Sequence, residues 1–239
     1  MENHNDAPWG GQDPRAISRG GPGRKERPGL RIAVDFDGVL FDHIPYVLRG
    51  FRDRFGIDLA AEGLRYWDYF HYRAVQEADL TYGCVRKVLD QIETDPLLHQ
   101  EPPREVLASR VISAWQGMGH HVSVVTAREP RSEAVTRMFL ERNGIPFDAI
   151  VMGQRIKTGY DVLIDDAPHN VLMAAADGGL ALLMDHPYNR DVPTHRNPLR
   201  VRDWADVSER VRAWHEHGAA LEPRPRLRDE VRPPLALRV

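Results

Sequence analysis

Six side chains able to bind a metal ion or a phosphate stand at or near the ends of short apolar segments. In chain order they are Asp35 and Asp37 after 30–34, Thr126 after 121–125, Lys157 shortly before 161–164, and Asp165 and Asp166 after it. In a parallel α/β sheet the carboxyl ends of the strands meet at one edge, where ligands bind. We therefore expect the carboxylates, the hydroxyl and the ammonium group to converge there.

This set of groups indicates a metal-assisted phosphate site. Neighbouring carboxylates raise one another's pKa unless a cation lies between them, and oxygen ligands of this kind suit Mg²⁺. The Thr126 hydroxyl, the Lys157 charge and the backbone N–H groups of the turns at 36–38 and 127–128 are suited to a phosphate. No Walker-type glycine-rich loop accompanies them.

Each of these signals has a less specific interpretation when taken alone. Asp165-Asp166 can be a strand-end turn, Thr126 a helix cap and Lys157 a surface lysine. The segment from Asp35 is not a calcium loop, because the required glycine and glutamate positions hold Leu40 and Tyr46. The functional interpretation depends on the order and spacing of all the groups together.

The pattern of the surrounding chain predicts a sheet that can position these groups. Short apolar runs occupy 30–34, 121–125, 148–152, 161–164 and 180–184. Helical stripes lie between or after them, at 103–119, 134–139, 169–177 and 204–214, the last with Asp203 as its N-cap. Strands that alternate with helices predict a parallel sheet covered on both faces, hence an α/β fold.

The long interval between the first two strands predicts a small helical cap at 45–100, inserted into a core formed by 30–44 and 101–217. Its aromatic cluster comprises Tyr66, Trp67, Tyr69, Phe70 and Tyr72. These rings either stack on a nucleobase or form the cap's own core. The segments 1–29 and 218–239 are rich in glycine, proline and charge, so we expect disordered tails.

Composition excludes several classes of protein. The chain has 239 residues, of which 42% are hydrophobic and 28% charged, with a net charge of −3. No apolar run is long enough to cross a membrane, and the charge balance does not favour a nucleic-acid polymer as partner. The single cysteine, Cys84, excludes an internal disulfide framework and favours a cytoplasmic location. The eleven histidines show no zinc-ligand spacing.

Four segments resemble the motifs of the haloacid-dehalogenase-type phosphatases: Val34–Leu40, Val124–Thr126, Lys157, and Leu163–Asp166. The most specific resemblance is to the 5′(3′)-deoxyribonucleotidase branch, through Lys157-Thr158 followed by Leu163–Asp166, the segment Asp185–Asn189 and the cap after the first motif. The chain departs from the Thr-Ser-Pro of the well-known animal members, because it reads Thr126-Ala127-Arg128.

The resemblance implies a doubly wound five-stranded sheet in the order 5-4-1-2-3. It implies that Asp35 is the nucleophile that forms an aspartyl-phosphate and that Asp37 is the general acid and base. Mg²⁺ would be held by Asp35, the Asp37 carbonyl and Asp166. Asp165 would be either a further direct ligand of the ion or a residue just outside its direct ligands. Phe36, Thr126, Ala127 and Lys157 would bind the phosphate.

For the substrate, the resemblance points to nucleoside monophosphates, with a sugar phosphate or another small phosphorylated metabolite as the alternative. A non-catalytic phosphate-binding module is disfavoured, since such a module does not need Asp37. Trp67 and Phe70 are candidate substrate contacts. Arg128 either pairs with the substrate or forms an ion pair with Asp165. The sequence leaves a homodimer open.

Overall fold

The computed structural model of the protein describes residues 28–194 and 197–218. The two segments expected to be disordered tails, 1–29 and 218–239, lie outside the described residues apart from 28, 29 and 218.

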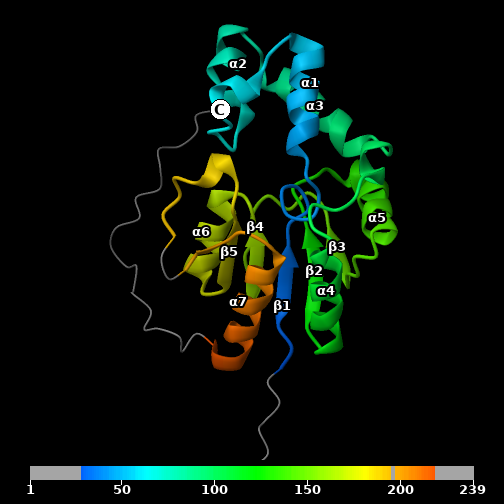
Figure 1. Ribbon diagram of the computed structural model, residues 1–239, viewed down its shortest axis with the longest axis vertical. Coiled ribbons are helices and arrows are strands. Elements are labelled where there is room, and N and C mark those ends of the chain that lie inside the picture. Colours follow the sequence, from blue (N-terminus) through cyan, green and yellow to red (C-terminus); the bar gives the residue numbers. More distant parts are fainter. Residues whose placement is uncertain (1–27, 195–196, 219–239) are drawn as a thin grey trace, which may run out of the picture.

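A parallel sheet of six strands, in the order β3-β2-β1-β4-β5-β6, forms the centre of the molecule (Figure 1). The strands are β1 (Arg31–Val34), β2 (His121–Val125), β3 (Ala149–Val151), β4 (Val162–Asp165), β5 (Leu180–Met184) and β6 (Leu199–Val201). The five predicted strands and their order are confirmed. The predicted number of strands is wrong, because the sheet has a sixth strand, β6. β6 gave no sequence signal because it is short, and its central residue is Arg200, whose guanidinium bonds to Asp185 and Asn189.

Seven α-helices and five short 3₁₀ helices accompany the strands within the described residues. The α-helices are α1 (Ile44–Phe55), α2 (Arg73–Glu77), α3 (Tyr82–Thr94), α4 (Leu107–Gly117), α5 (Glu133–Arg142), α6 (Pro168–Asp177) and α7 (Trp204–His217). The 3₁₀ helices are η1 (Leu59–Glu62), η2 (Tyr69–His71), η3 (Leu98–Gln100), η4 (Pro130–Ser132) and η5 (Pro187–Asn189). Asp203 caps α7 as predicted, accepting a hydrogen bond from Asp206 N at 2.8 Å.

The two faces of the sheet bury different amounts of apolar surface. Side chains alternate along each strand, so Ile32 and Val34 face one side while Ala33 faces the other. The side of Ile32 packs with α4, α5 and α7 in a large cluster, whereas the side of Ala33 is covered by α6 in a small one. This arrangement fixes β1 and β4 at the centre of the sheet, where their carboxyl ends carry the acidic motifs.

Much of the segment between β1 and β2 is helical, and its part with α1, α2 and α3 lies above the carboxyl ends of the strands, whereas α4 lies beside the sheet (Figure 1). We call residues 44–100 the helical insertion. It begins with a proline in the first turn of α1, and Thr81 caps α3 through Cys84 N at 3.3 Å. Apolar side chains of α1 and α3, such as Phe51 and Val88, belong to the same buried cluster as the sheet. The insertion is therefore held by packing that is continuous with the core.

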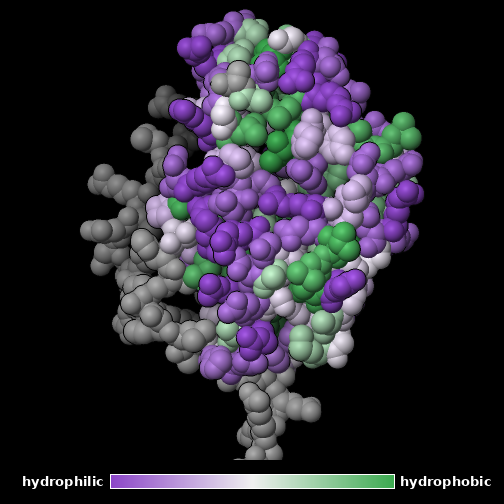
Figure 2. All heavy atoms as spheres, in the orientation of Figure 1, coloured by the Kyte–Doolittle hydropathy of each residue, from purple (hydrophilic) through white to green (hydrophobic). Residues whose placement is uncertain are grey.

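The surface seen in Figure 2 is covered mostly by hydrophilic side chains, with an apolar patch over α4. Val106 and Leu107, at the start of that helix, are exposed. Among the described residues, no helix combines the length and the apolar character that crossing a membrane requires.

Replacing Trp204 by alanine should lower the free energy of unfolding by about 3 to 5 kcal/mol, the usual cost of removing a buried aromatic ring. Trp204 is fully buried and packs on Trp115 at a ring-centroid distance of 5.9 Å, which docks α7 on α4. Trp214, half-buried on the same helix, is the matched control, and its replacement should cost about 1 kcal/mol. Chemical denaturation measures both, and equal losses would contradict this account of the packing.

Candidate active site

The strand ends bring together the acidic residues and the candidate phosphate-binding residues that the sequence singled out. Asp35 continues β1, and its N–H donates to the Ile164 carbonyl of β4 at 2.9 Å. Thr126 continues β2, and its N–H donates to the Val151 carbonyl of β3 at 3.0 Å. Because the sheet hydrogen bonding extends to these residues, their side chains start from fixed backbone positions.

Lys157 is the centre of the cluster. Its Nζ lies 2.7 Å from Asp35 Oδ1 and 2.8 Å from Asp165 Oδ2, and its side chain is 1% exposed. Burial disfavours the charge, but Asp165 and Asp35 outweigh that effect and raise the pKa of Lys157. Lys157 is therefore a permanent cation at this site.

Asp165 is committed to protein donors through both of its oxygens. Oδ2 accepts from Lys157 and from Asn170 Nδ2 at 3.0 Å, and Oδ1 accepts from the Ala167 N–H at 2.8 Å. Asp35 uses only Oδ1 in its polar contacts within the described chain, with Lys157 and with Phe36 N at 2.7 Å. Its Oδ2 is left for other chemistry.

The carboxylates fit a divalent cation. One oxygen each of Asp35, Asp165 and Asp166 lies within 4.8 Å of the others. Burial raises the pKa of Asp166 to about 7, with Asp165 contributing in the same direction, and burial raises the pKa of Asp35 well above its ordinary value. Such crowding of buried carboxylates is relieved by a bound cation, and an oxygen-only donor set suits Mg²⁺.

Asp166 is held from the side of Gly38. The hydroxyl of Tyr188 donates to Asp166 Oδ2, and a side chain at position 38 would place its Cβ 2.3 Å from that same oxygen. Gly38 also has a φ of +77°, which favours glycine. The turn after β1 therefore needs glycine for its backbone and for the close approach of Asp166.

The groups suited to a phosphate lie at the same edge. Thr126 is 1% exposed, and its Oγ1 accepts from the Arg128 N–H at 3.2 Å, which leaves the hydroxyl proton to be donated elsewhere. Within the described part of the chain, the N–H groups of Asp37 and Ala127 donate no hydrogen bond. Phe36 differs, because its N–H donates to Asp35 and its ring is fully buried.

Arg128 forms a two-pronged ion pair with Asp37, and the expected alternative, a pair with Asp165, is wrong. Nε and Nη2 of Arg128 each lie 2.7 Å from a carboxylate oxygen of Asp37. The guanidinium carbon lies 4.5 Å from the Phe36 ring centroid. Burial acts to raise the pKa of Asp37, but Arg128 outweighs it and the pKa is lowered. Asp165 is paired with Lys157 instead, at 2.8 Å.

His99 completes this arrangement and gave no sequence signal. Its Nε2 lies 2.7 Å from Arg128 Nη1, and its Nδ1 lies 2.7 Å from the Asp95 carbonyl. Burial, with help from Arg128, lowers the pKa of His99 to about 4. His99 is therefore neutral, with its proton on Nδ1 toward Asp95, and it accepts a hydrogen bond from Arg128. Asn170 and Tyr188 were missed as well, although Tyr188 lies within the segment Asp185–Asn189.

The aromatic residues of the helical insertion divide into two groups. Tyr72 is fully buried and Phe70 is half-buried against the main core. Trp67 is 45% exposed, and its ring lies 4.9 Å from that of His169, just beyond Asp165 and Asp166 in the chain. Trp67 is thus placed near the acidic edge, whereas Phe70 contributes to packing.

A parallel sheet with these acidic strand ends and a helical insertion after the first strand defines a phosphatase of the haloacid-dehalogenase type. Residues 29–215 match the family described as 5′ nucleotidase, deoxy (Pyrimidine), cytosolic type C protein, and the chain belongs to that family. It is accordingly a 5′-nucleotidase-like phosphatase.

A curated relative and two solved structures resemble the chain over most of its length. A nucleotidase of Clostridium acetobutylicum is 26% identical over 198 residues, covering 74% of this chain and 91% of the relative. The solved structure of a predicted phosphatase from the same species has a TM-score of 0.52 and 14% identity to this chain, and the match covers 77% of this chain and 99% of that one. The L-2-haloacid dehalogenase RSc1362 has a TM-score of 0.52 and 13% identity, with coverage of 78% and 100%. The two structures share the fold.

The Arg128–Asp37 pair should couple strongly in a double-mutant cycle of unfolding free energies. Arg128→Met leaves the Asp37 carboxylate without its partner, so adding Asp37→Asn should recover part of the lost stability. We expect a coupling of about 2 kcal/mol, below the usual figure for fully buried pairs because the Asp37 side chain is 25% exposed. The exposed pair Arg137–Glu133 is the control, with coupling under about 0.5 kcal/mol. Additive effects at Arg128 and Asp37 would contradict the pairing.

Mg²⁺ should raise the melting temperature more at about pH 8 than at about pH 6. A carboxyl whose pKa is raised by folding costs stability as pH rises from its unfolded pKa through its folded pKa, here from about 4 to about 7 for Asp166. Mg²⁺ stabilises the ionised form and competes with protons at the lower pH. Thermal scans with and without Mg²⁺ at both pH values measure this difference, and Asp166→Asn should reduce it. Equal shifts at the two pH values would argue against a cation at Asp166.

Proposed function

We propose that the protein is a Mg²⁺-dependent phosphomonoesterase that forms an aspartyl-phosphate on Asp35 and hydrolyses nucleoside monophosphates. The observation that carries the proposal is the state of Asp35. Its Oδ1 is bound by Lys157 and by the Phe36 N–H, and its Oδ2 is free of protein donors within the described chain. A carboxylate fixed through one oxygen presents the other as a nucleophile.

In the first half of the reaction, Asp35 Oδ2 attacks the phosphorus, and the bond between phosphorus and the leaving oxygen breaks. Asp37 gives its proton to that oxygen, so the nucleoside leaves as an alcohol. The charge of the transferring phosphoryl group is met by the Lys157 ammonium, the Thr126 hydroxyl and the N–H groups of Asp37 and Ala127.

In the second half, Asp37 takes a proton from water as the water oxygen attacks the phosphorus of the aspartyl-phosphate. The bond from phosphorus to Asp35 breaks, which releases inorganic phosphate and restores both carboxyl groups. Arg128 favours the ionised Asp37 that this half needs, because it lowers the pKa of that carboxyl against the effect of burial. To act as the acid, Asp37 must first be protonated. Arg128 opposes this protonation because it stabilises the ionised carboxylate.

Mg²⁺ would be held by the carboxylates of Asp35 and Asp166 and by the Asp37 carbonyl, with Asp165 one shell out because its oxygens are committed to Lys157, Asn170 and Ala167. When bound, it neutralises carboxylate and phosphate charge and lets the dianion approach Asp35.

The helical insertion is proposed as a cap over the phosphate site. Trp67, exposed beside His169, is the aromatic side chain best placed to contact a base, whereas the packing of Phe70 favours a structural role. The single cysteine is in keeping with the reducing cytoplasm.

Asp37→Asn should separate the two half-reactions. An aryl phosphate has a good leaving group, so it should still phosphorylate Asp35 and give a burst of about one product per site, followed by a slow phase because water lacks its base. A nucleoside monophosphate should react about 10²–10⁴-fold more slowly than with the wild type. Rapid-quench kinetics measures both.

Asp35→Asn is the matched control and should form no phosphoenzyme. Near wild-type turnover of the nucleotide by Asp37→Asn would remove Asp37 from the acid–base role.

A further inference from the structure

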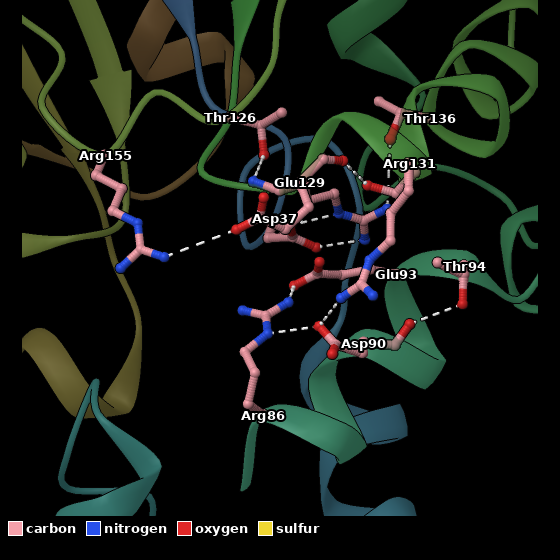
Figure 3. Close-up of polar contacts among 12 residues, drawn as sticks. Asp37, Arg86, Asp90, Glu93, Thr94, Thr126, Glu129, Arg131, Thr136 and Arg155 are labelled. Carbon is pink, nitrogen blue, oxygen red and sulfur yellow. Dashed lines mark hydrogen bonds and ion pairs between the residues drawn. The ribbon is translucent and has the colours of Figure 1, made fainter. Parts of the chain in front are cut away.

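A cavity of about 460 Å³ lies between the helical insertion and the loops after β2 and β3. Its lining combines three arginines with one acid, and consists of Tyr82, Arg86, Glu129, Pro130, Arg131 and Arg155. Its volume is within the range of about 300–1,000 Å³ typical of small-molecule pockets. Figure 3 shows Arg86, Arg131 and Arg155 reaching in from three different segments of the chain.

The arginines are only partly satisfied by protein acids. Asp90 Oδ1 is shared by two guanidiniums, at 2.6 Å from Arg86 Nε and 2.7 Å from Arg131 Nη2. Arg155 lies 3.8 Å from Glu129, its side chain is 68% exposed, and it donates no hydrogen bond within the described residues. A guanidinium has five N–H donors in a planar fork that matches phosphate oxygens. Arg131 and Arg155 therefore have donors available for an anion.

The cavity borders the phosphate site. Glu129 is three residues after Thr126, and Arg155 is two residues before Lys157. A chain of three residues spans at most about 11 Å and one of two residues about 7 Å, so the backbones of Glu129 and Arg155 lie within that reach of the backbones of Thr126 and Lys157. Two hydrogen bonds tie the loops together: Gly153 N to the Arg128 carbonyl at 2.8 Å and Gln154 N to the Thr126 carbonyl at 2.9 Å.

We propose that this cavity, which we call the arginine pocket, binds a second phosphate of the substrate while the scissile phosphate lies against Asp35. The inference rests on the proposed phosphomonoesterase function and extends its substrates from nucleoside monophosphates to compounds with a second phosphate about one sugar ring away, such as a nucleoside 3′,5′-bisphosphate. Arg155 and Arg131 bind the second phosphate, and Arg86 forms the wall on the side of the insertion.

The charges near the cavity support an anion. Asp90 does not line it, and Glu93, which pairs with Arg86, is only 12% exposed in its side chain. Burial raises the pKa of Glu93, and Asp37 acts in the same direction. Glu129 is the one acid of the lining, and its weak pair with Arg155 is the contact that a phosphate would replace.

The test measures binding on the full-length chain carrying Asp35→Asn, so that ligands are not consumed. Calorimetry in the presence of Mg²⁺ compares a deoxynucleoside 5′-monophosphate with the 3′,5′-bisphosphate of the same nucleoside. We expect the bisphosphate to bind about tenfold tighter, since charge-assisted hydrogen bonds to one guanidinium are worth at least that ratio. Adding Arg155→Gln should reduce the advantage at least about fivefold, and adding Glu129→Gln should increase it. Arg110→Gln, on the exposed face of α4, is the matched control and should leave it unchanged.

Equal affinities for the two ligands would overturn the proposal, as would an Arg155→Gln variant that weakens both ligands alike. Turnover of the same two compounds by the wild-type chain distinguishes a failure of the arginine pocket from a failure of the proposed phosphomonoesterase function. If it hydrolyses neither but the Arg155-dependent binding advantage is present, the arginine pocket stands and the proposed phosphomonoesterase function is wrong.

Discussion

The contact of the buried Lys157 ammonium with Asp35 and Asp165 is the constraint on which the rest of the site depends. Three carboxylates crowd within a few ångströms at the ends of β1 and β4. Lys157 compensates part of that charge and fixes one oxygen of Asp35 and one of Asp165 at the same time. Removing it would leave these buried carboxylates without a neutralising positive charge, a situation that costs several kcal/mol in proteins. The sheet can place these acids together because this cation is placed with them.

A second cation divides the acidic groups further. Arg128 takes both oxygens of Asp37, as Lys157 and its neighbours take those of Asp165. Two of the four carboxylates are thereby committed to protein partners, and the remaining two, Asp35 and Asp166, have oxygens for a metal ion and a phosphate. Arg128 is itself oriented by the neutral His99 and by the Phe36 ring. The division of roles among chemically identical side chains thus follows from whether the buried cations and neighbouring donors occupy one oxygen of a carboxylate or both.

The sequence predicts most of the sheet and the position of the acidic edge, and the reason is local. β1, β2, β4 and β5 are short apolar runs that end at polar residues, so period and composition identify them. β6 has Arg200 at its centre, and only its parallel pairing with β5 identifies it as a strand. Asp35, Asp165 and Asp166 are predicted as neighbours because strand ends converge. The partner of Arg128 is not predictable in this way, since it depends on side-chain direction and on the prior pairing of Asp165 with Lys157.

The helical insertion shows the same limit for aromatic residues. The sequence of the aromatic segment from Tyr66 to Tyr72 does not show which of its rings are buried. In the fold Tyr72 is inside the core and Trp67 is exposed beside His169, because the 3₁₀ turn η2 (Tyr69–His71), capped by Asp68, separates the two. Since Phe51 and Val88 of the insertion pack into the core of the sheet, Trp67 and Arg86 extend from a framework that is continuous with the strands carrying Asp35 and Asp165. In the proposed function, the side chains that act on the phosphate and those that contact the leaving group are therefore carried by one packed core.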